Sequence, residues 1–177
     1  DNIGHGTACA GIIRKKAPES SLVSVRIFDE SLQTDGYSLV AAIGWAAARG
    51  IDVVNLSLGT TDLWFRDVLF DACHDAVKVG VIIVAADHNE RQESLPAVFS
   101  NVIGVAAGRF ADPLGYRYRP LHRIECVAHG DMQRVCWLNS GELFVGGTSY
   151  AAAHISGIVA RIREAHPGCP LVEVRRI

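Results

Sequence analysis

The sequence has no surplus of positive charge and no long uninterrupted hydrophobic run. Its formal net charge is −2, so it lacks the basic surface with which proteins neutralise a phosphate backbone, and we expect no nucleic acid among its partners. The longest purely apolar run, residues 81–86, has the length of a strand and falls far short of the ~20 residues that cross a bilayer. We therefore expect no membrane span either.

Paired cysteines are lacking as well. The cysteines show no CxxC spacing and lie scattered along the chain, at Cys9, Cys73, Cys126, Cys136 and Cys169. An odd and irregular set argues against a disulfide framework and against a zinc site, and we predict buried, mostly reduced thiols, which favours a cytoplasmic location. No dense run of Asp and Asn indicates calcium, and the histidines show no metal spacing, so we expect neither a metal nor an organic cofactor.

What the sequence does contain is an alternation of strand and helix patterns. Strand patterns occur at residues 22–28, 52–59, 81–86 and 102–107, and helix patterns at residues 39–47, 64–77 and 148–166. Near-continuous apolar strands separated by helices predict an α/β fold, a three-layer, doubly wound, mainly parallel sheet with helices on both faces. After Gly108 the pattern changes to short pieces, which we interpret as loops with antiparallel strands. Residues 1–177 are interpreted as a single domain.

Two segments place a reactive side chain at the start of a helix rich in small residues. His5 lies between two glycines in residues 4–11, and Ser149 follows two glycines in residues 146–154. Alone, a serine at a helix start is usually an N-cap, and a lone histidine is usually a surface or core residue. Together they indicate a reactive site, because small residues admit a substrate backbone and unpaired N–H groups of a first turn can stabilise an oxyanion.

The same segments resemble the signatures of a known family. Residues 1–7 (DNIGHGT) resemble the histidine signature of subtilisin-like serine peptidases, and residues 147–151 (GTSYA) resemble their serine signature. Residues 54–59 (VNLSLG) resemble the substrate-binding strand of that family. The resemblance spans the whole chain in the right order and implies a subtilisin-like fold, with Ser149 as nucleophile and His5 as general base.

The third member of the family's catalytic triad, an aspartate on a strand well before the histidine, has no counterpart here. Asp1 is too close to His5 on the same loop, and Asp29 and Asp52 are interpreted as a turn residue and a strand-start residue. We expect the triad aspartate upstream of residue 1 and interpret the chain as an amino-terminally truncated domain. A further departure is Ala153, where the family's serine helix generally has proline, and we expect it to be tolerated.

The family's oxyanion asparagine usually lies in an Ala-Ala-Gly-Asn turn after a strand. Residues 84–90 read Val-Ala-Ala-Asp-His-Asn-Glu instead. Matching from the left places His88 at the asparagine position, whereas matching the Asn-Glu pair from the right places Asn89 there. We favour Asn89, because an amide donates a hydrogen bond whatever the pH, and His88 remains the alternative.

The resemblance also implies how a peptide would bind. An extended peptide or protein substrate would pair with the backbone at Ser57, Leu58 and Gly59 and at Ala85 and Ala86. Leu58, Ala85 and Ala86 would then line the pocket for the residue before the cleaved bond, and the alternative is that these three residues are plain ends of core strands.

Three functions can be compared on these motifs. We predict a serine endopeptidase, weakly active or inactive as this chain alone, and the alternative is a catalytically silent relative that binds peptide segments. An esterase of the α/β-hydrolase type is excluded, since Ser149 lacks the Gly-x-Ser-x-Gly elbow and His5 precedes it. Cleavage specificity and oligomeric state are not indicated, and members of the resembled family are often secreted.

Overall fold

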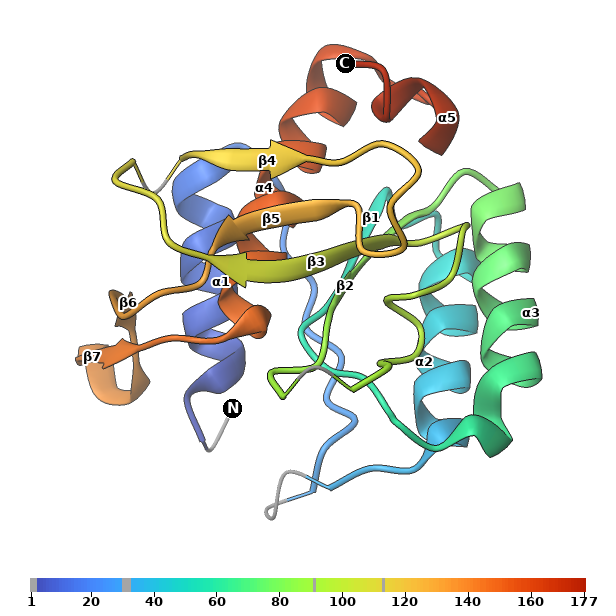
Figure 1. Cartoon of the computed structure of the whole chain (residues 1–177), viewed down its shortest axis with the longest axis horizontal. Coiled ribbons are helices and arrows are strands. Elements are labelled where there is room, and N and C mark those ends of the chain that lie inside the picture. The colour runs from blue at the N-terminus through green and yellow to red at the C-terminus, as the bar shows by residue number, and fades with distance from the viewer. Residues whose placement is uncertain (1–2, 30–32, 91, 113) are drawn as a thin grey trace.

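A five-stranded sheet forms the centre of the computed structural model, which describes residues 3–29, 33–90, 92–112 and 114–177. The strands lie in the order β1 (Val53–Leu56), β2 (Ile82–Ala86), β3 (Ile103–Gly108), β5 (Cys126–His129) and β4 (Tyr116–Tyr118) (Figure 1). The first four are parallel, and β4 pairs antiparallel with β5. A separate antiparallel hairpin consists of β6 (Gln133–Cys136) and β7 (Glu142–Val145).

Helices cover both faces of this sheet. On one face lie α2 (Gly36–Ala48) and α3 (Arg66–Lys78), and on the other lie α1 (His5–Lys16) and the long α4 (Thr148–Ala165) (Figure 1). The short helices η1 (Leu63–Phe65), η2 (Leu138–Ser140) and α5 (Leu171–Val174) complete the structure. The three-layer α/β prediction is therefore confirmed.

The uninterrupted apolar run of β2 follows from this double coverage. Ile83 and Ala85 pack into the core beneath α2 and α3, whereas Ile82, Val84 and Ala86 pack into the core beneath α4. Because successive side chains of a strand point to opposite faces, a strand covered on both sides needs an apolar residue at every position.

The two helices α1 and α4 approach each other closely. A Cβ atom added to Gly157 of α4 would lie 2.5 Å from the Cβ of Lys16 of α1, so only glycine permits this separation. A third apolar cluster, which includes Cys9, Val135 and Ala153, fills the space between α1, α4 and β6. The helix α4 continues unbroken through Ala153, as expected for a tolerated replacement of proline.

One predicted strand is wrong. Residues 22–28 have a strand-like sequence but form no strand, and the side chains of Leu22, Val23 and Val25 are exposed. A strand is stabilised by ladder hydrogen bonds to a neighbour, and no described segment pairs with residues 22–28. The expectation for the region after Gly108 is confirmed for β4 and for the β6–β7 hairpin, but β5 joins the main sheet in parallel with β3.

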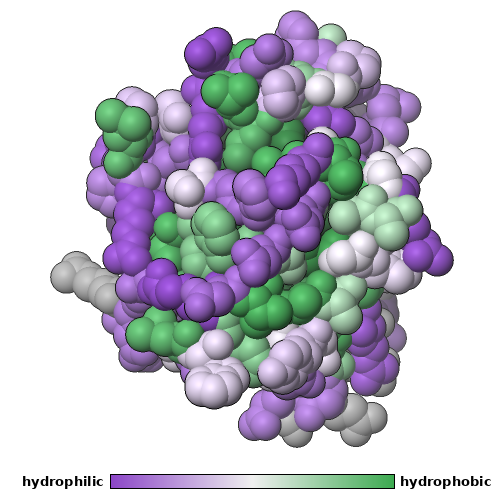
Figure 2. Space-filling model, turned by 90° about the vertical axis from the view of Figure 1, so that its right-hand side faces the viewer, coloured by the Kyte–Doolittle hydropathy of each residue, from purple (hydrophilic) through white to green (hydrophobic). Residues whose placement is uncertain are grey.

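Three further features concern the cysteines, the length of the helices and one outer face of the molecule. Four of the five cysteines are buried, as predicted, and Cys136 is exposed. No helix within the described ranges is long and apolar enough to cross a membrane. On the side of the molecule formed by α2 and α3, hydrophobic residues are visible between hydrophilic ones (Figure 2).

Candidate active site

His5 and Ser149 each occupy the first turn of a helix, and these two helices pack against each other. The residue before α1, Gly4, has φ +96°, and the residue before α4, Gly147, has φ +150°, conformations that side chains rarely adopt. The ring of His5 lies 5.8 Å, centroid to centroid, from the ring of Tyr150, the neighbour of Ser149. The fold thus brings the predicted base next to the helical turn that carries the predicted nucleophile, from opposite ends of the sequence.

Ser149 is held against the predicted substrate-binding segment. Its hydroxyl donates to the carbonyl oxygen of Ser57 at 3.1 Å, and the hydroxyl of Ser57 donates to the carbonyl oxygen of Ser149 at 2.7 Å. Ser57 follows β1 directly, so this reciprocal pair fixes the start of α4 at the carboxyl end of the sheet.

The two alternatives for the oxyanion donor lie in different surroundings. The Oδ1 atom of Asn89 accepts from the backbone N–H of Thr148 at 3.0 Å and lies 3.2 Å from its hydroxyl. This fixes the amide beside the first turn of α4, with its NH2 group available as a donor. The Nδ1 atom of His88 instead accepts from the backbone N–H of Glu90 at 3.0 Å, within its own turn. Of these two side chains, only that of Asn89 forms a hydrogen bond with the start of α4 among the described residues.

Burial controls the charges at this site. It lowers the pKa of His5, which favours the neutral imidazole that a general base requires. It also raises the pKa of the Cys9 thiol to about 11, against the effect of a hydrogen bond to Ser57. No carboxylate in the described part of the chain is among the causes that shift the pKa of His5. No group of three or more described His, Cys, Asp or Glu side chains could hold a metal ion.

The predicted substrate-binding residues form two adjacent segments at the carboxyl ends of β1 and β2. Leu56 pairs with Ala85 in the parallel register, so Ser57, Leu58 and Gly59 leave the sheet next to Ala86. Leu58 is half-buried and packs against the core beneath α2 and α3. The side chains of Ala85 and Ala86 are buried in the two cores, so these residues can offer a substrate only their backbone.

Sequence reasoning did not identify Ser94, which lies at these two segments. Its hydroxyl oxygen lies 3.5 Å from the carbonyl oxygen of Ala86, and a Cβ atom at Gly59 would lie 2.2 Å from it. The backbone of the next residue, Leu95, forms an antiparallel bridge with Thr60. Ser94 thus closes the space between the two segments, and the only sequence signal for this contact is the absence of a side chain at Gly59.

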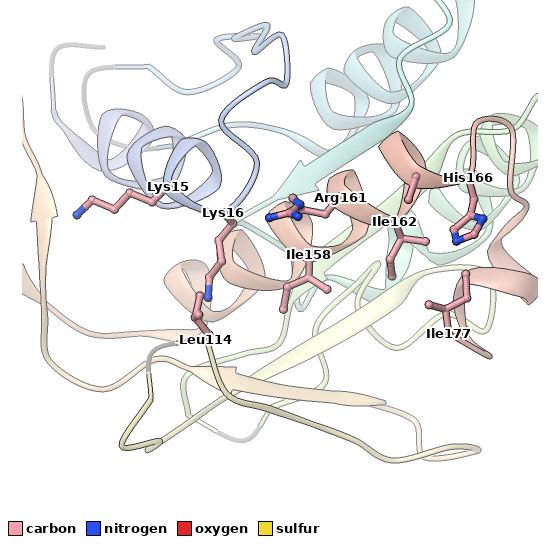
Figure 3. A pocket seen from close by; sticks show the side chains of 9 residues that line it. Lys15, Lys16, Leu114, Ile158, Arg161, Ile162, His166 and Ile177 are labelled. Carbon is pink, nitrogen blue, oxygen red and sulfur yellow. The ribbon is translucent and has the colours of Figure 1, made fainter.

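A cavity of about 460 Å³ lies away from all these residues. It is lined by the last turns of α1 and α4, with Lys16, Arg161 and His166 among the basic groups and Ile158 and Ile162 among the apolar ones (Figure 3). His5 and Ser149 lie in the first turns of the same two helices. The cavity and the candidate site are therefore separated by the length of α1 and by much of α4.

Comparison with known proteins identifies the family. The family model described as "Subtilase family" matches residues 1–177. The chain belongs to the subtilase family. Among curated relatives of this subtilase chain, the "Minor extracellular protease Epr" of Bacillus subtilis (strain 168) is 33% identical over 187 residues, which cover 99% of the chain and 29% of that relative. The "Major intracellular serine protease" of the same organism is 32% identical over 182 residues, which cover 92% of the chain and 56% of that relative.

Solved structures agree with the fold. The subtilase chain matches "Sphericase" with a TM-score of 0.84 and 25% identity, over 99% of this chain and 68% of that one. A cold-adapted subtilisin-like serine proteinase matches with a TM-score of 0.83 and 23% identity, which supports the fold alone. The chain spans 29% to 56% of the length of the two curated relatives named above, so their activities belong to longer polypeptides.

Proposed function

We propose that this subtilase chain supplies the nucleophile, the general base and the oxyanion site of a serine endopeptidase that cleaves peptides or proteins. The hydroxyl of Ser149 attacks the scissile carbonyl carbon while the neutral ring of His5 takes its proton. The NH2 group of Asn89 and the backbone N–H of Ser149 donate to the oxygen that becomes negative. The protonated ring of His5 then gives its proton to the leaving amine, and water hydrolyses the acyl-enzyme with His5 again as base.

One observation carries this proposal. The side-chain amide of Asn89 is bound to Thr148, the residue before Ser149, while His5 packs on Tyr150, the residue after it. The proposed nucleophile, base and amide donor thus come from three parts of the chain to one helical turn, which supports the proposal. A serine that served only as an N-cap would not require the other two.

The carboxylate that orients His5 is the component still required. The free edge of β1, at the end of the sheet order, has no partner strand among the described residues, and the strand-like residues 22–28 pair with none. We propose that a strand of the parent protein lies along this edge and places an aspartate beside His5. Without it the imidazole is neither fixed in one tautomer nor stabilised when protonated.

The test is to compare the chain alone with the chain expressed together with its upstream region. The longer protein should hydrolyse a peptide substrate and react with a fluorophosphonate at Ser149, and Ser149→Ala should abolish both. By analogy with loss of a triad aspartate, the 177 residues alone should turn over about 10⁴-fold more slowly. Equal turnover by the two proteins would show that a carboxylate within the chain already orients His5.

A catalytically silent, peptide-binding domain is the second candidate. It is favoured by the hydrogen bond of the Ser149 hydroxyl to a carbonyl group and by the absence of a described carboxylate among the causes of the His5 pKa shift. If the longer protein binds a peptide but shows neither hydrolysis nor fluorophosphonate labelling, this second function replaces the first.

A further inference from the structure

The hydroxyl group of Ser57 has three partners from three different elements. It lies 2.9 Å from Nδ2 of Asn55 in β1, 3.3 Å from the sulfur of Cys9 in α1 and 2.7 Å from the carbonyl oxygen of Ser149 in α4. A serine hydroxyl has one hydrogen to donate and can accept two. These three contacts therefore use its full capacity.

The donor and acceptor roles in this series of hydrogen bonds can be assigned. The carbonyl oxygen of Ser149 can only accept, so the single hydrogen of the Ser57 hydroxyl must point to it. Asn55 must then present its NH2 group to Ser57, which leaves its Oδ1 atom facing Ser156. The hydroxyl of Ser156 lies 2.8 Å from that Oδ1 atom and donates to it.

The side-chain periodicities of β1 and α4 bring these four polar residues together. Asn55 and Ser57 are alternate residues of an extended segment and therefore lie on one side of it. Ser149 and Ser156 are about two turns apart in α4 and lie on one face of that helix. A short row of hydrogen-bonded polar groups thus connects the end of β1 to the first and third turns of α4, beside the apolar cluster beneath α4. Ser156 is only 2% exposed, so an unsatisfied group here would have no water to replace its partner.

We propose that Asn55 is a positioning residue for the hydrolytic reaction, which acts through Ser57 to hold the backbone of Ser149. The inference rests on the proposed peptidase function and assigns Asn55 no contact with substrate. Its amide orients the Ser57 hydroxyl, and that hydroxyl fixes the carbonyl of the residue whose side chain attacks and whose N–H faces the oxyanion. Small displacements of a nucleophile reduce the rate of the chemical step more than they reduce ground-state binding.

The substitution Asn55→Asp tests this direction of hydrogen bonding with little change of shape. A carboxylate can only accept, so the hydrogen of Ser57 should turn towards it and leave the Ser149 carbonyl without its donor. We expect kcat to fall about 10- to 100-fold while KM changes less than about twofold. Ser57→Ala should give the same pattern, and Ser57→Thr, which keeps the hydroxyl, should recover most of kcat.

The matched control is Asn101→Ala. Asn101 is also half-buried, but it precedes the amino end of the central strand β3, at the end of the sheet opposite to Ser57, and its amide has no hydrogen-bond partner among the described residues. All variants are made in the protein with its upstream region, and thermal unfolding is measured alongside kinetics. If Asn55→Asp does not fold, Ser156→Ala, which removes one hydrogen bond from Asn55, gives the deciding kcat.

The outcomes separate the two proposals. A fall in kcat at nearly constant KM for Asn55→Asp or Ser156→Ala, with Asn101→Ala unchanged, supports the positioning role. An unchanged kcat, or a rise in KM alone, overturns that role and leaves the peptidase function standing. Absence of hydrolysis and of fluorophosphonate labelling in the unsubstituted protein overturns both.

Discussion

Lowering the pH should destabilise this fold through His154, a histidine of α4 that is only 6% exposed. Its Nε2 atom lies 2.9 Å from Oε1 of Gln133 and therefore carries the hydrogen, whereas its Nδ1 atom has no hydrogen-bond partner among the described residues. Burial, followed by the nearby charges of Lys16, His129 and Lys15, lowers the pKa of His154 to about 3. A proton on Nδ1 would place an additional positive charge among these groups.

The sign and size of the effect follow from linkage. The unfolded chain takes up the proton near the ordinary pKa of about 6.5, while the folded chain resists it until about pH 3. The contribution of neutral His154 to stability is therefore fully present above about pH 6.5 and is lost progressively as the pH falls towards 3. Between pH 7 and pH 5 the loss is about 2 kcal/mol, because stability falls by about 1.36 kcal/mol for each pH unit below the ordinary pKa of 6.5 while folded His154 stays neutral.

Urea unfolding at pH 7 and pH 5 measures this loss, with His154→Gln as the comparison. Glutamine does not titrate and can still donate to Gln133, so the variant should lose about 2 kcal/mol less than the unsubstituted chain between the two pH values. Other histidines, including His5 with its lowered pKa, remain in both proteins and cancel in the difference. The same pH dependence in both proteins would refute the reasoning.

Four substitutions test other parts of the site in the protein with its upstream region. Asn89→Ala should lower turnover about 10²–10³-fold with little change in KM, a general figure that comes from a subtilisin and not from this chain. If His88→Ala causes that loss instead, the histidine is the oxyanion donor. Gly4→Ala should lower both the unfolding temperature and the fluorophosphonate labelling of Ser149. Residue 4 has φ +96°, and its new Cβ would lie 2.4 Å from the ring of Trp137. An unchanged unfolding temperature and unchanged labelling would contradict this close packing. Ser94→Gly should widen the space between Gly59 and Ala86 and so favour larger side chains before the cleaved bond in a peptide library, and an unchanged preference would show that Ser94 does not limit that space.

The layers of the fold could be predicted because their signals are local. The apolar run at residues 81–86 and the stripe of the α3 helix each reflect a face that must be buried. The strand predicted at residues 22–28 was wrong because strand formation is not a local property. A strand needs a neighbour, and the sequence of one segment does not reveal whether a partner is present. Local patterns predict which residues can form a strand, and pairing determines whether they do.

The site was predictable to the extent that it follows from motifs. The positions of His5 and Ser149 could be inferred from their glycine-flanked helix starts. The chemistry of an amide favoured Asn89 over His88, but the hydrogen bond that fixes Asn89 could not be inferred, because its partner Thr148 is distant in sequence. Asn55 was likewise hidden, since an asparagine in a strand acquires meaning only when a specific helix face lies opposite it.

The close approach at Gly157 has a consequence for the motions of the molecule. In this contact the backbone of α4 at Gly157 packs directly on the Cβ of Lys16 in α1. Helices packed this closely have little freedom to slide or rotate independently. The pair α1 and α4 should therefore fluctuate as one rigid body, and the separation of His5 from Ser149 should be nearly insensitive to movements of the surrounding loops. A glycine near the middle of α4 would in this way limit how much the distance between His5 and Ser149, which lie in the first turns of the two helices, can fluctuate.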